Sequence, residues 1–303
     1  MQGLILLNKP EGLTSFSAVS RMKRIVGEKR VGHTGTLDPM ATGGLPILVG
    51  RATALSSLML DANKKYIATI RLGLTTDTDD ITGNILTQNA VSVSKKELET
   101  ALQHFTGEIM QTPPMFSALK KDGVRLYKLA RQGQTVEIQP RRITVLELKL
   151  LSELNEQNEF KVEAFVSKGT YIRSLARDIG EYLGEYLGCG ATLSALERSF
   201  ASGFSVEDCV TLEQLSENCE KYILNEEKAV EHLRQITVTN KQAVRFCNGG
   251  KLDFQRLKIT EPLQNELLRV KLGETLLGIG VADCENQQVA IKCIINYPKG
   301  ENE

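Results

Sequence analysis

One stretch of the sequence decides how we expect the rest to fold: Val31-Gly32-His33-Thr34-Gly35-Thr36-Leu37-Asp38-Pro39-Met40-Ala41-Thr42-Gly43-Gly44-Leu45. It holds one acidic side chain, Asp38, among four glycines, one proline and three threonines, which is too irregular for a helix and too poor in side chains for a core strand. Glycine permits the close approach of a ligand, and Pro39 biases Asp38 away from the helical region. The sequence therefore predicts a shaped loop that presents one carboxylate, although plain turns have the same composition.

The length and composition of the chain indicate a globular protein of two domains. Its 303 residues are enough for a large core. No apolar run approaches the roughly 20 residues of a membrane span, and residues 1–7 are too short for a signal peptide, so we expect a cytoplasmic protein that binds no membrane. Three histidines and six cysteines without C-x-x-C spacing argue against a zinc site and for reduced thiols: Cys189, Cys209, Cys219, Cys247, Cys284 and Cys293.

The net charge of zero hides an uneven distribution along the chain. Residues 117–149 carry eight basic and three acidic side chains, and residues 1–60 carry seven and three. Residues 150–235 compensate with eight basic and sixteen acidic side chains. Phosphate contacts need a local basic face, not a basic whole, so two basic segments favour a nucleic-acid partner. Ordinary solvated surface charge is the alternative for most of these residues.

The segments on either side of the loop read as alternating strands and helices. We expect strands at 3–8, 45–49 and 64–73 and helices at 52–60 and after Thr14 or Ser15, the latter with an apolar face of Phe16, Val19, Met22 and Ile25. The 64–73 strand places Tyr66, Ala68, Ile70 and Leu72 on one face, where a tyrosine is usually a core residue.

Ser94 and Glu97 form a capping box that opens another helix. Asp77, Asp79 and Asp80 are interpreted as turn residues and not as a metal site, because no distal ligands complement them.

Residues 111–142 combine a Pro113-Pro114 break with basic side chains interleaved with Phe116 and Tyr127, a composition typical of an RNA-facing surface. Two strands, 141–151 and 159–166, should follow. A helix should then begin near Thr170, a possible N-cap, which places Arg173 in its first turn. An arginine there opposes the helix dipole and needs an acidic partner. Asp178 or Glu163 could supply one.

The second half of the chain offers less chemistry. Glu181-Tyr182-Leu183-Gly184 is repeated as Glu185-Tyr186-Leu187-Gly188, which should lengthen the far end of the helix by about one turn, or roughly 6 Å, and leave Arg173 in place. Capped short helices are expected at 205–208 and 211–214. Beyond residue 235 we expect one helix at 240–248, ended by Gly249-Gly250, and strands at 267–272, 275–281 and 289–295, a pattern that fits a small barrel.

Five motifs in this order resemble the TruB family of tRNA pseudouridine synthases. They are Lys9-Pro10, the Asp38 loop, Lys65-Tyr66, Ser117-Ala118-Leu119-Lys120 and Lys168-Gly169-Thr170-Tyr171-Ile172-Arg173. The resemblance implies an α+β fold with a mixed, largely antiparallel sheet and flanking helices. It divides the chain into a catalytic domain at 1–235, with an RNA-binding thumb at about 111–142, and a small PUA-like β-barrel domain at 236–303. Where the family usually has Tyr before Ser-Ala-Leu-Lys, this chain has Phe116.

The resemblance also implies an activity, the isomerisation of the T-loop uridine of tRNA, position 55 in standard numbering, to pseudouridine without metal or organic cofactor. Asp38 would act as nucleophile or base, Tyr66 would stack on the flipped uridine, and Arg173 would pair with Asp38. An arginine in contact favours the ionised carboxylate that a nucleophile needs. Substrate contacts would come from six further residues: Lys9, His33, Leu196, Tyr171, Lys120 and Arg141.

The expected partner is the tRNA T arm, bound by a monomer that needs no other protein. Two alternatives stay open. A non-catalytic tRNA-binding or tRNA-folding protein would need the basic segments but not Asp38, Tyr66 and Arg173 together. A guide-RNA-dependent synthase of the dyskerin branch would share the Asp38 loop but usually carries extended basic tails.

Overall fold

The computed structural model describes residues 1–187 and 189–298, and all their side chains except those of 185–187. Its largest element is a sheet with the strand order β1 (Gly3–Lys9), β3 (Thr42–Val49), β12 (Ala191–Ala201), β4 (Lys64–Leu72), β11 (Glu159–Val166), β10 (Arg141–Leu150) and β7 (Gly107–Gln111). Short strands β2 (Val31–His33) and β13 (Phe204–Ser205) pair with β3 and β12. Neighbours are antiparallel except β12 and β3, which run parallel. The α+β class with a mixed, largely antiparallel sheet is confirmed.

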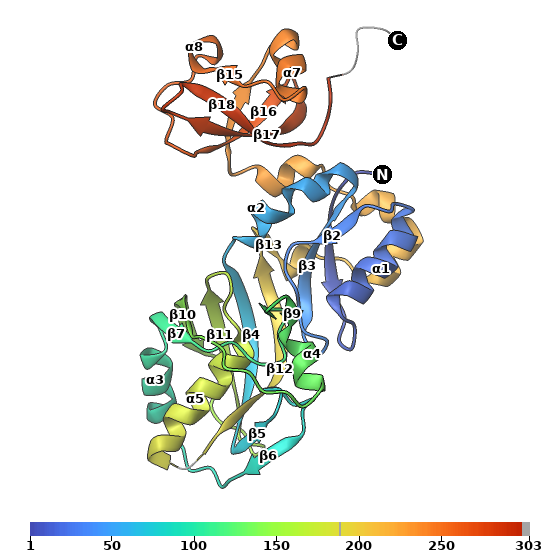
Figure 1. Cartoon of the computed structure of the whole chain (residues 1–303). Helices are drawn as coiled ribbons and strands as arrows, with labels where there is room; N and C mark the ends of the chain where they lie inside the picture. Colours follow the sequence, from blue (N-terminus) through green and yellow to red (C-terminus); the bar gives the residue numbers. More distant parts are fainter. Residues whose placement is uncertain (188, 299–303) are drawn as a thin grey trace.

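Three helices cover this sheet and close its core (Figure 1). Helix α1 (Ser15–Val26) begins at the N-cap Thr14, α3 (Lys95–His104) begins at the predicted capping box of Ser94 and Glu97, and α5 is Ile172–Leu187. Their apolar residues join those of β1, β3, β4, β11 and β12 in one buried cluster. Strand β4 alternates between buried and partly exposed residues along its whole length, so the predicted common face of Tyr66, Ala68, Ile70 and Leu72 is confirmed.

Shorter elements connect the main ones. The 3₁₀ helix η1 (Gly50–Leu55) and helix α2 (Ser56–Leu60) follow β3, and the hairpin of β5 (Leu74–Thr76) and β6 (Ile85–Gln88) follows β4. After β13 come η2 (Val206–Asp208), α6 (Leu212–Asn218), η3 (Cys219–Tyr222) and η4 (Glu226–Val230). The predicted caps at Ser205 and Thr211 are both present as capping boxes.

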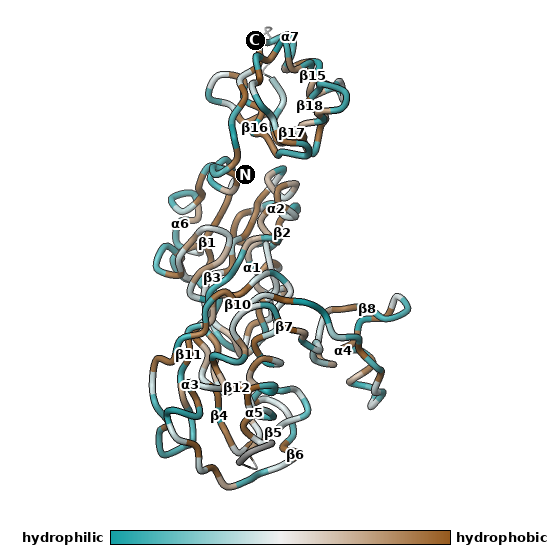
Figure 2. Tube along the Cα trace, turned by 90° about the vertical axis from the view of Figure 1, so that its left-hand side faces the viewer, coloured by the Kyte–Doolittle hydropathy of each residue, from teal (hydrophilic) through white to brown (hydrophobic). Residues whose placement is uncertain are grey.

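The residues between β7 and β10 leave the body of the molecule as a projecting arm, which Figure 2 shows to one side of the sheet. The arm holds the two-stranded ribbon of β8 (Lys120–Lys121) and β9 (Val124–Arg125), and then α4 (Leu126–Arg131). Its basic side chains Lys120, Lys121 and Arg125 are exposed.

A second sheet follows residue 233 and stands at one end of the molecule, beyond the chain's N-terminus (Figure 1). Its strand order is β14 (Arg234–Thr237), β16 (Leu267–Leu272), β17 (Thr275–Asp283), β18 (Gln288–Ile294) and β15 (Leu252–Asp253), with helices α7 (Asn240–Cys247) and α8 (Phe254–Leu257). It has its own apolar cluster, centred on Phe246 and Leu277. A third cluster joins Leu276 and Ile279 to Leu4 and Leu48, so the two sheets share buried contacts.

The structure corrects four local predictions. The stretch 31–45 is irregular only at 34–41, because Val31–His33 and Thr42–Val49 are strands. Phe16, expected on the apolar face of α1, is 78% exposed, since Ala18, Val19, Met22 and Val26 form that face.

The other two corrections concern helix beginnings. The expected helix at 52–60 is the 3₁₀ turn η1 followed by the short α2. Helix α5 begins at Ile172, so Thr170 is not its N-cap; the buried Thr170 hydroxyl has no hydrogen-bond partner within the described residues.

Candidate active site

Asp38 lies in the irregular loop 34–41 between β2 and β3, and its side chain is 32% exposed. Two neighbours fix the backbone on either side of it. The Ser15 hydroxyl at the start of α1 donates to the Leu37 carbonyl at 3.0 Å and accepts from the Leu37 amide at 2.8 Å. The Gly12 amide donates to the Pro39 carbonyl at 2.8 Å. The carboxylate is therefore held at a defined point while its oxygens stay open to a ligand.

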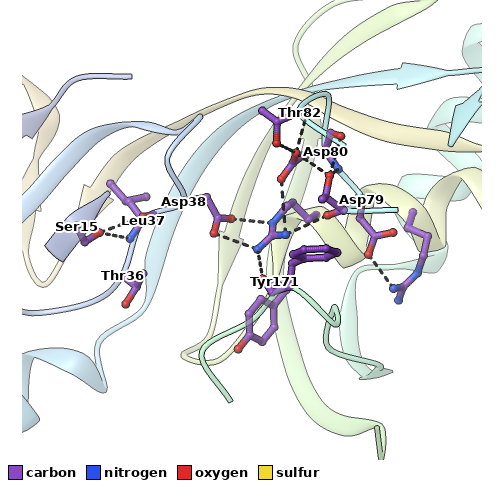
Figure 3. A network of polar contacts seen from close by, with 12 residues as sticks. Ser15, Thr36, Leu37, Asp38, Asp79, Asp80, Thr82 and Tyr171 are labelled. Carbon is purple, nitrogen blue, oxygen red and sulfur yellow. Dashed lines mark hydrogen bonds and ion pairs between the residues drawn. The ribbon is translucent and has the colours of Figure 1, made fainter. Parts of the chain in front are cut away.

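Arg173, from the first turn of α5, meets Asp38 with a two-pronged contact (Figure 3). Its Nε donates to Asp38 Oδ2 at 2.8 Å, and its Nη2 donates to Asp38 Oδ1 at 3.0 Å. The same guanidinium donates to the carbonyls of Thr78 and Phe116, each at 3.0 Å, and its Nη1 lies 3.6 Å from Asp80 Oδ2. The Arg173 side chain is 5% exposed. Such a bidentate contact from a mostly buried guanidinium fixes the orientation of the carboxylate.

Arg173 therefore has the acidic partner that its position requires, but neither alternative named from the sequence supplies it. Asp178 pairs instead with Arg177 at 2.8 Å, and Glu163 lies on β11 opposite Lys149. The partners are Asp38 and Asp80, both of which precede Arg173 by many residues in the sequence.

Asp80 was missed as a site residue because the acidic segment 77–80 was judged only as a turn or metal site. Its side chain accepts hydrogen bonds from the hydroxyls of Thr78 and Thr82 and from the Thr82 amide, which orient it toward Arg173. The backbone of this segment is a turn, as predicted. Its carboxylates also need cationic partners, which are Arg173 for Asp80 and Arg177 for Asp79. In the described part of the chain, no three His, Cys, Asp or Glu side chains are grouped to hold a metal ion.

Arg177, one turn after Arg173, makes a parallel set of contacts. It donates to Asp79 at 3.0 Å, to Asp178 at 2.8 Å and to the carbonyl of Thr112 at 3.0 Å. Burial raises the pKa of Asp79 above its ordinary value and that of Asp178 to about 6, against the opposing effect of Arg177. Through Thr112, this cluster attaches α5 to the base of the projecting arm.

Tyr66 and Leu196 lie on neighbouring strands and belong to the same apolar cluster as Leu37, which precedes Asp38. Leu196 on β12 is opposite Ala68 on β4, and Tyr66 is two residues from Ala68, so all three side chains share one face of the sheet. Tyr66 is 7% exposed and Leu196 is 7% exposed. No polar contact joins Tyr66 to Asp38 or Arg173 within the described residues, so these two residues form an apolar wall, separate from the ion pair.

Lys9 is fully buried at the end of β1, directly behind the loop. Its ammonium donates to the carbonyls of Pro10 at 2.8 Å, Leu13 at 2.7 Å and Pro39 at 3.4 Å. Burial lowers its pKa to about 8, although Asp38 acts in the opposite direction. Lys9 therefore supports the loop from inside, and its buried ammonium is not presented to solvent.

Four further predicted residues lie at different depths. His33 is partly buried at the end of β2, where Nδ1 accepts from the Gly35 amide at 3.2 Å and burial lowers its pKa. Tyr171 precedes α5 beside the ion pair (Figure 3), and its backbone is held by both ends of the Gln111 side-chain amide. Arg141 begins β10 opposite Gln111, whereas Lys120 is out on the arm.

The repeated segment falls at the other end of α5 from Arg173. The helix continues to Leu187, as the duplication predicts, and Gly188, the last residue of the repeat, lies outside the described residues. Gly180 explains how the helix fits, because a Cβ there would lie 2.3 Å from the Ala191 backbone of β12.

Arg198 on β12 is the other residue that the sequence analysis missed. It is 1% exposed, and its guanidinium donates to the carbonyls of Gly44 at 2.7 Å, Gly35 at 3.3 Å and Thr36 at 3.5 Å. A sequence pattern does not show which backbone carbonyls a side chain will contact. The only available signal for Arg198 was its position two residues after Leu196.

Chemically, the site offers one partly exposed carboxylate, an arginine that fixes it, and an apolar wall from two adjacent strands. Such a carboxylate can attack an electrophilic carbon or remove a proton, and the wall can receive a flat ring. No span of the described residues forms a helix that could cross a membrane.

Comparisons with known proteins agree with this geometry. The model of the TruB family pseudouridylate synthase N-terminal domain matches residues 23–172, and that of the tRNA pseudouridylate synthase B C-terminal domain matches residues 173–238. The chain is 40% identical to tRNA pseudouridine synthase B of Clostridium kluyveri over 283 residues, which cover 93% of this chain and 96% of that protein. It is 41% identical to tRNA pseudouridine synthase B of Geotalea uraniireducens, with 93% and 92% covered.

Solved structures show the same fold in a different setting. A chain of an H/ACA ribonucleoprotein bound to a substrate RNA containing 2′-deoxyuridine matches with a TM-score of 0.74 at 25% identity, covering 98% of this chain and 87% of that one. A chain of a Cbf5–Nop10–Gar1 complex matches with a TM-score of 0.73 at 27% identity, covering 98% and 84%.

Proposed function

This chain belongs to the TruB family of tRNA pseudouridine synthases, and we propose that it converts the T-loop uridine at position 55 of tRNA to pseudouridine with Asp38 as the reacting group. The observation that carries the proposal is the two-pronged contact of Asp38 with the buried Arg173. An arginine in this geometry fixes the orientation of the carboxylate, whose side chain stays 32% exposed.

The reaction breaks the bond between uracil N1 and ribose C1′ and forms a bond between C5 and C1′. The proton on C5 leaves to solvent and N1 gains one, so the product is an isomer of the substrate. Asp38 serves this exchange in one of two ways. It adds to C1′ and is displaced when C5 bonds there, or it removes a proton to start the cleavage. In both, Arg173 holds the carboxylate and Asp80 holds Arg173.

The uridine must leave its stack to reach Asp38, which costs a few kcal/mol and is offset by stacking in a pocket. We assign that pocket to Tyr66 and Leu196, the apolar wall on β4 and β12. Lys9 and His33 hold the loop from behind, and Tyr171 and Arg141 line its approach.

The projecting arm and the second sheet supply the remaining RNA contacts in this proposal. The arm carries exposed Lys120, Lys121 and Arg125 and is attached to the site through the Phe116 carbonyl, which accepts from Arg173. It acts as the thumb over the T arm. The second sheet, taken as a PUA-like domain of residues 236–303, binds RNA farther from the reacting base. The protein acts in the cytoplasm as a monomer.

One experiment separates this proposal from its rivals. Purified protein alone is incubated with an unmodified tRNA transcript, and pseudouridine is mapped by carbodiimide treatment and primer extension. We expect a single site, the T-loop uridine at position 55. Binding without pseudouridine would favour a tRNA-binding protein. Activity only after addition of a guide RNA or partner proteins would favour the dyskerin branch, whose solved relatives are found in complexes.

A further inference from the structure

A second buried arginine, Arg198, binds backbone carbonyls at both ends of the Asp38 loop. Arg198 donates to Gly35 and Thr36, which precede Asp38 in the chain, and to Gly44, which follows it. One planar guanidinium therefore connects the entry and the exit of the loop. Because the five donors of arginine have a fixed arrangement, this contact constrains the separation of the two ends more than a lysine could.

The backbone of Arg198 fits the same loop with little room to spare. Glu197 and Arg198 on β12 pair in parallel with Thr42 and Gly43 on β3, whereas the other neighbouring strands described in the main sheet run antiparallel. Gly43 has a positive φ of 104°, and a Cβ there would lie 2.4 Å from the Arg198 carbonyl oxygen. Glycine at position 43 thus lets the exit of the loop lie directly on β12.

No carboxylate within salt-bridge distance balances Arg198 in the part of the chain described here. Its charged neighbours are Lys9 and Lys64, and Arg198 contributes to the lowered pKa of each, which burial brings to about 8. Burying a cation without an anion costs free energy, which the hydrogen bonds of Arg198 to three loop carbonyls offset. The contacts of this arginine are therefore directed to the backbone of the loop.

We propose that Arg198 is a positioning residue for the reaction. Through these hydrogen bonds it fixes the position of the Asp38 loop relative to β12, the strand that also carries Leu196. The Asp38 carboxylate is thereby placed relative to Tyr66 and Leu196, the residues proposed to contact the base. Arg198 touches no substrate and acts only through the loop backbone. This inference rests on the proposed role of Asp38. A shift of about 1 Å in a reacting group is enough to lower a rate about 100-fold.

The test compares Arg198→Lys and Arg198→Met with the unaltered protein in single-turnover reactions at saturating tRNA. Lysine keeps the positive charge but lacks the planar guanidinium that reaches both ends of the loop. We therefore expect a rate constant about 10-fold lower for Arg198→Lys and about 100-fold lower for Arg198→Met. The dissociation constant for tRNA should change by less than about threefold, because the substituted side chain faces no RNA. A purely structural role would not produce this split between rate and affinity.

Leu98→Ala is the control for lost stability. Leu98 is 1% exposed and belongs to the same apolar cluster, but it lies on α3, which packs against α5 and β10. All variants are assayed at a temperature at which circular dichroism shows them folded. We expect Leu98→Ala to lower the melting temperature and keep a rate constant within about twofold of the unaltered protein.

The inference is overturned if the folded Arg198→Lys protein reacts within about twofold of the unaltered protein, or if its defect lies only in tRNA affinity. It is also overturned if Leu98→Ala loses as much rate as Arg198→Lys. If Arg198→Met does not fold, Arg198→Lys decides alone. An inactive unaltered protein, or an active Asp38→Asn, would instead refute the proposed function and is recognised separately.

Discussion

Two buried arginines hold the Asp38 loop, one at its carboxylate and one at its backbone, and their hydrogen-bonding groups are satisfied in different ways. Arg173 meets two carboxylates, of Asp38 and Asp80, and two backbone carbonyls. Arg198 meets three backbone carbonyls and, within the described residues, no carboxylate. An ion pair orients a carboxylate, whereas carbonyl contacts fix only the path of the backbone. In the proposed reaction, Arg173 acts on the carboxylate itself and Arg198 acts on the position of the loop that carries it.

The largest effect on the reaction is expected from replacing Arg173. Arg173→Met leaves the carboxylates of Asp38 and Asp80 facing each other without the cation between them. We expect the single-turnover rate constant to fall by about 1,000-fold or more, while tRNA affinity falls less than about tenfold. Rapid-quench assays at saturating tRNA and filter binding measure the two quantities. A rate within about tenfold of the unaltered protein would remove Arg173 from the chemistry.

Asp80→Asn tests the second ion pair of Arg173, the one with Asp80. Asparagine keeps the shape and the hydrogen bonds from Thr78 and Thr82 but removes the second negative charge near Arg173. We expect a rate about tenfold lower, less than at Arg173, because the direct contact with Asp38 remains. Asp77→Asn is the matched control, since Asp77 bonds to Asn84 on the same loop. Equal effects of the two substitutions would argue that only the loop's fold matters.

The basic arm should affect binding and leave the chemistry alone. Replacing Lys120 and Arg125 together by glutamine removes two exposed charges from the β8–β9 ribbon. We expect a dissociation constant several-fold higher, about threefold per lost phosphate contact at moderate salt, and a shallower dependence on salt concentration. The rate at saturating tRNA should not change. A slower saturated rate would place the arm in the reacting geometry itself.

The last effect concerns stability and not the reaction, and Lys64 is the buried cation to measure. Its ammonium donates to the carbonyls of Leu60 and Ala62, and burial lowers its pKa from 10.5 to about 8. Between these values the unfolded chain binds more protons than the folded one, so this group makes stability rise with pH. The stability of the unaltered protein relative to Lys64→Met should therefore increase by about 1–2 kcal/mol from about pH 7.5 to about pH 9.5. Urea unfolding at the two pH values measures it, and a difference independent of pH would contradict it.

Much of the fold follows from local patterns. The alternation in β4, the capping boxes at Ser94, Ser205 and Thr211, and the strand at 267–272 are all as predicted. Each depends on neighbours within a few residues, where side-chain period and hydrogen-bonding chemistry decide the outcome. The contact of Asp38 with Arg173 was expected only from the resemblance to the TruB family, because no local pattern brings together residues so far apart.

What the sequence did not predict depends on tertiary packing. The ends of the Asp38 loop are strands because Gly43 fits against the backbone of Arg198, which composition alone does not disclose. Phe16 is exposed because the helix turns other residues to the sheet. Asp80 was given no role because its partner is distant in sequence, and Arg198 because its partners are carbonyls.

The most direct test labels a tRNA transcript with tritium at C5 of the T-loop uridine only and follows tritium release in a single turnover. Formation of the C5–C1′ bond requires that proton to leave, so release reports the reaction itself. We predict one tritium released per tRNA with the purified protein alone, and none with Asp38→Asn, which should still bind tRNA within about tenfold of the unaltered affinity. Release by Asp38→Asn at a comparable rate would contradict the account.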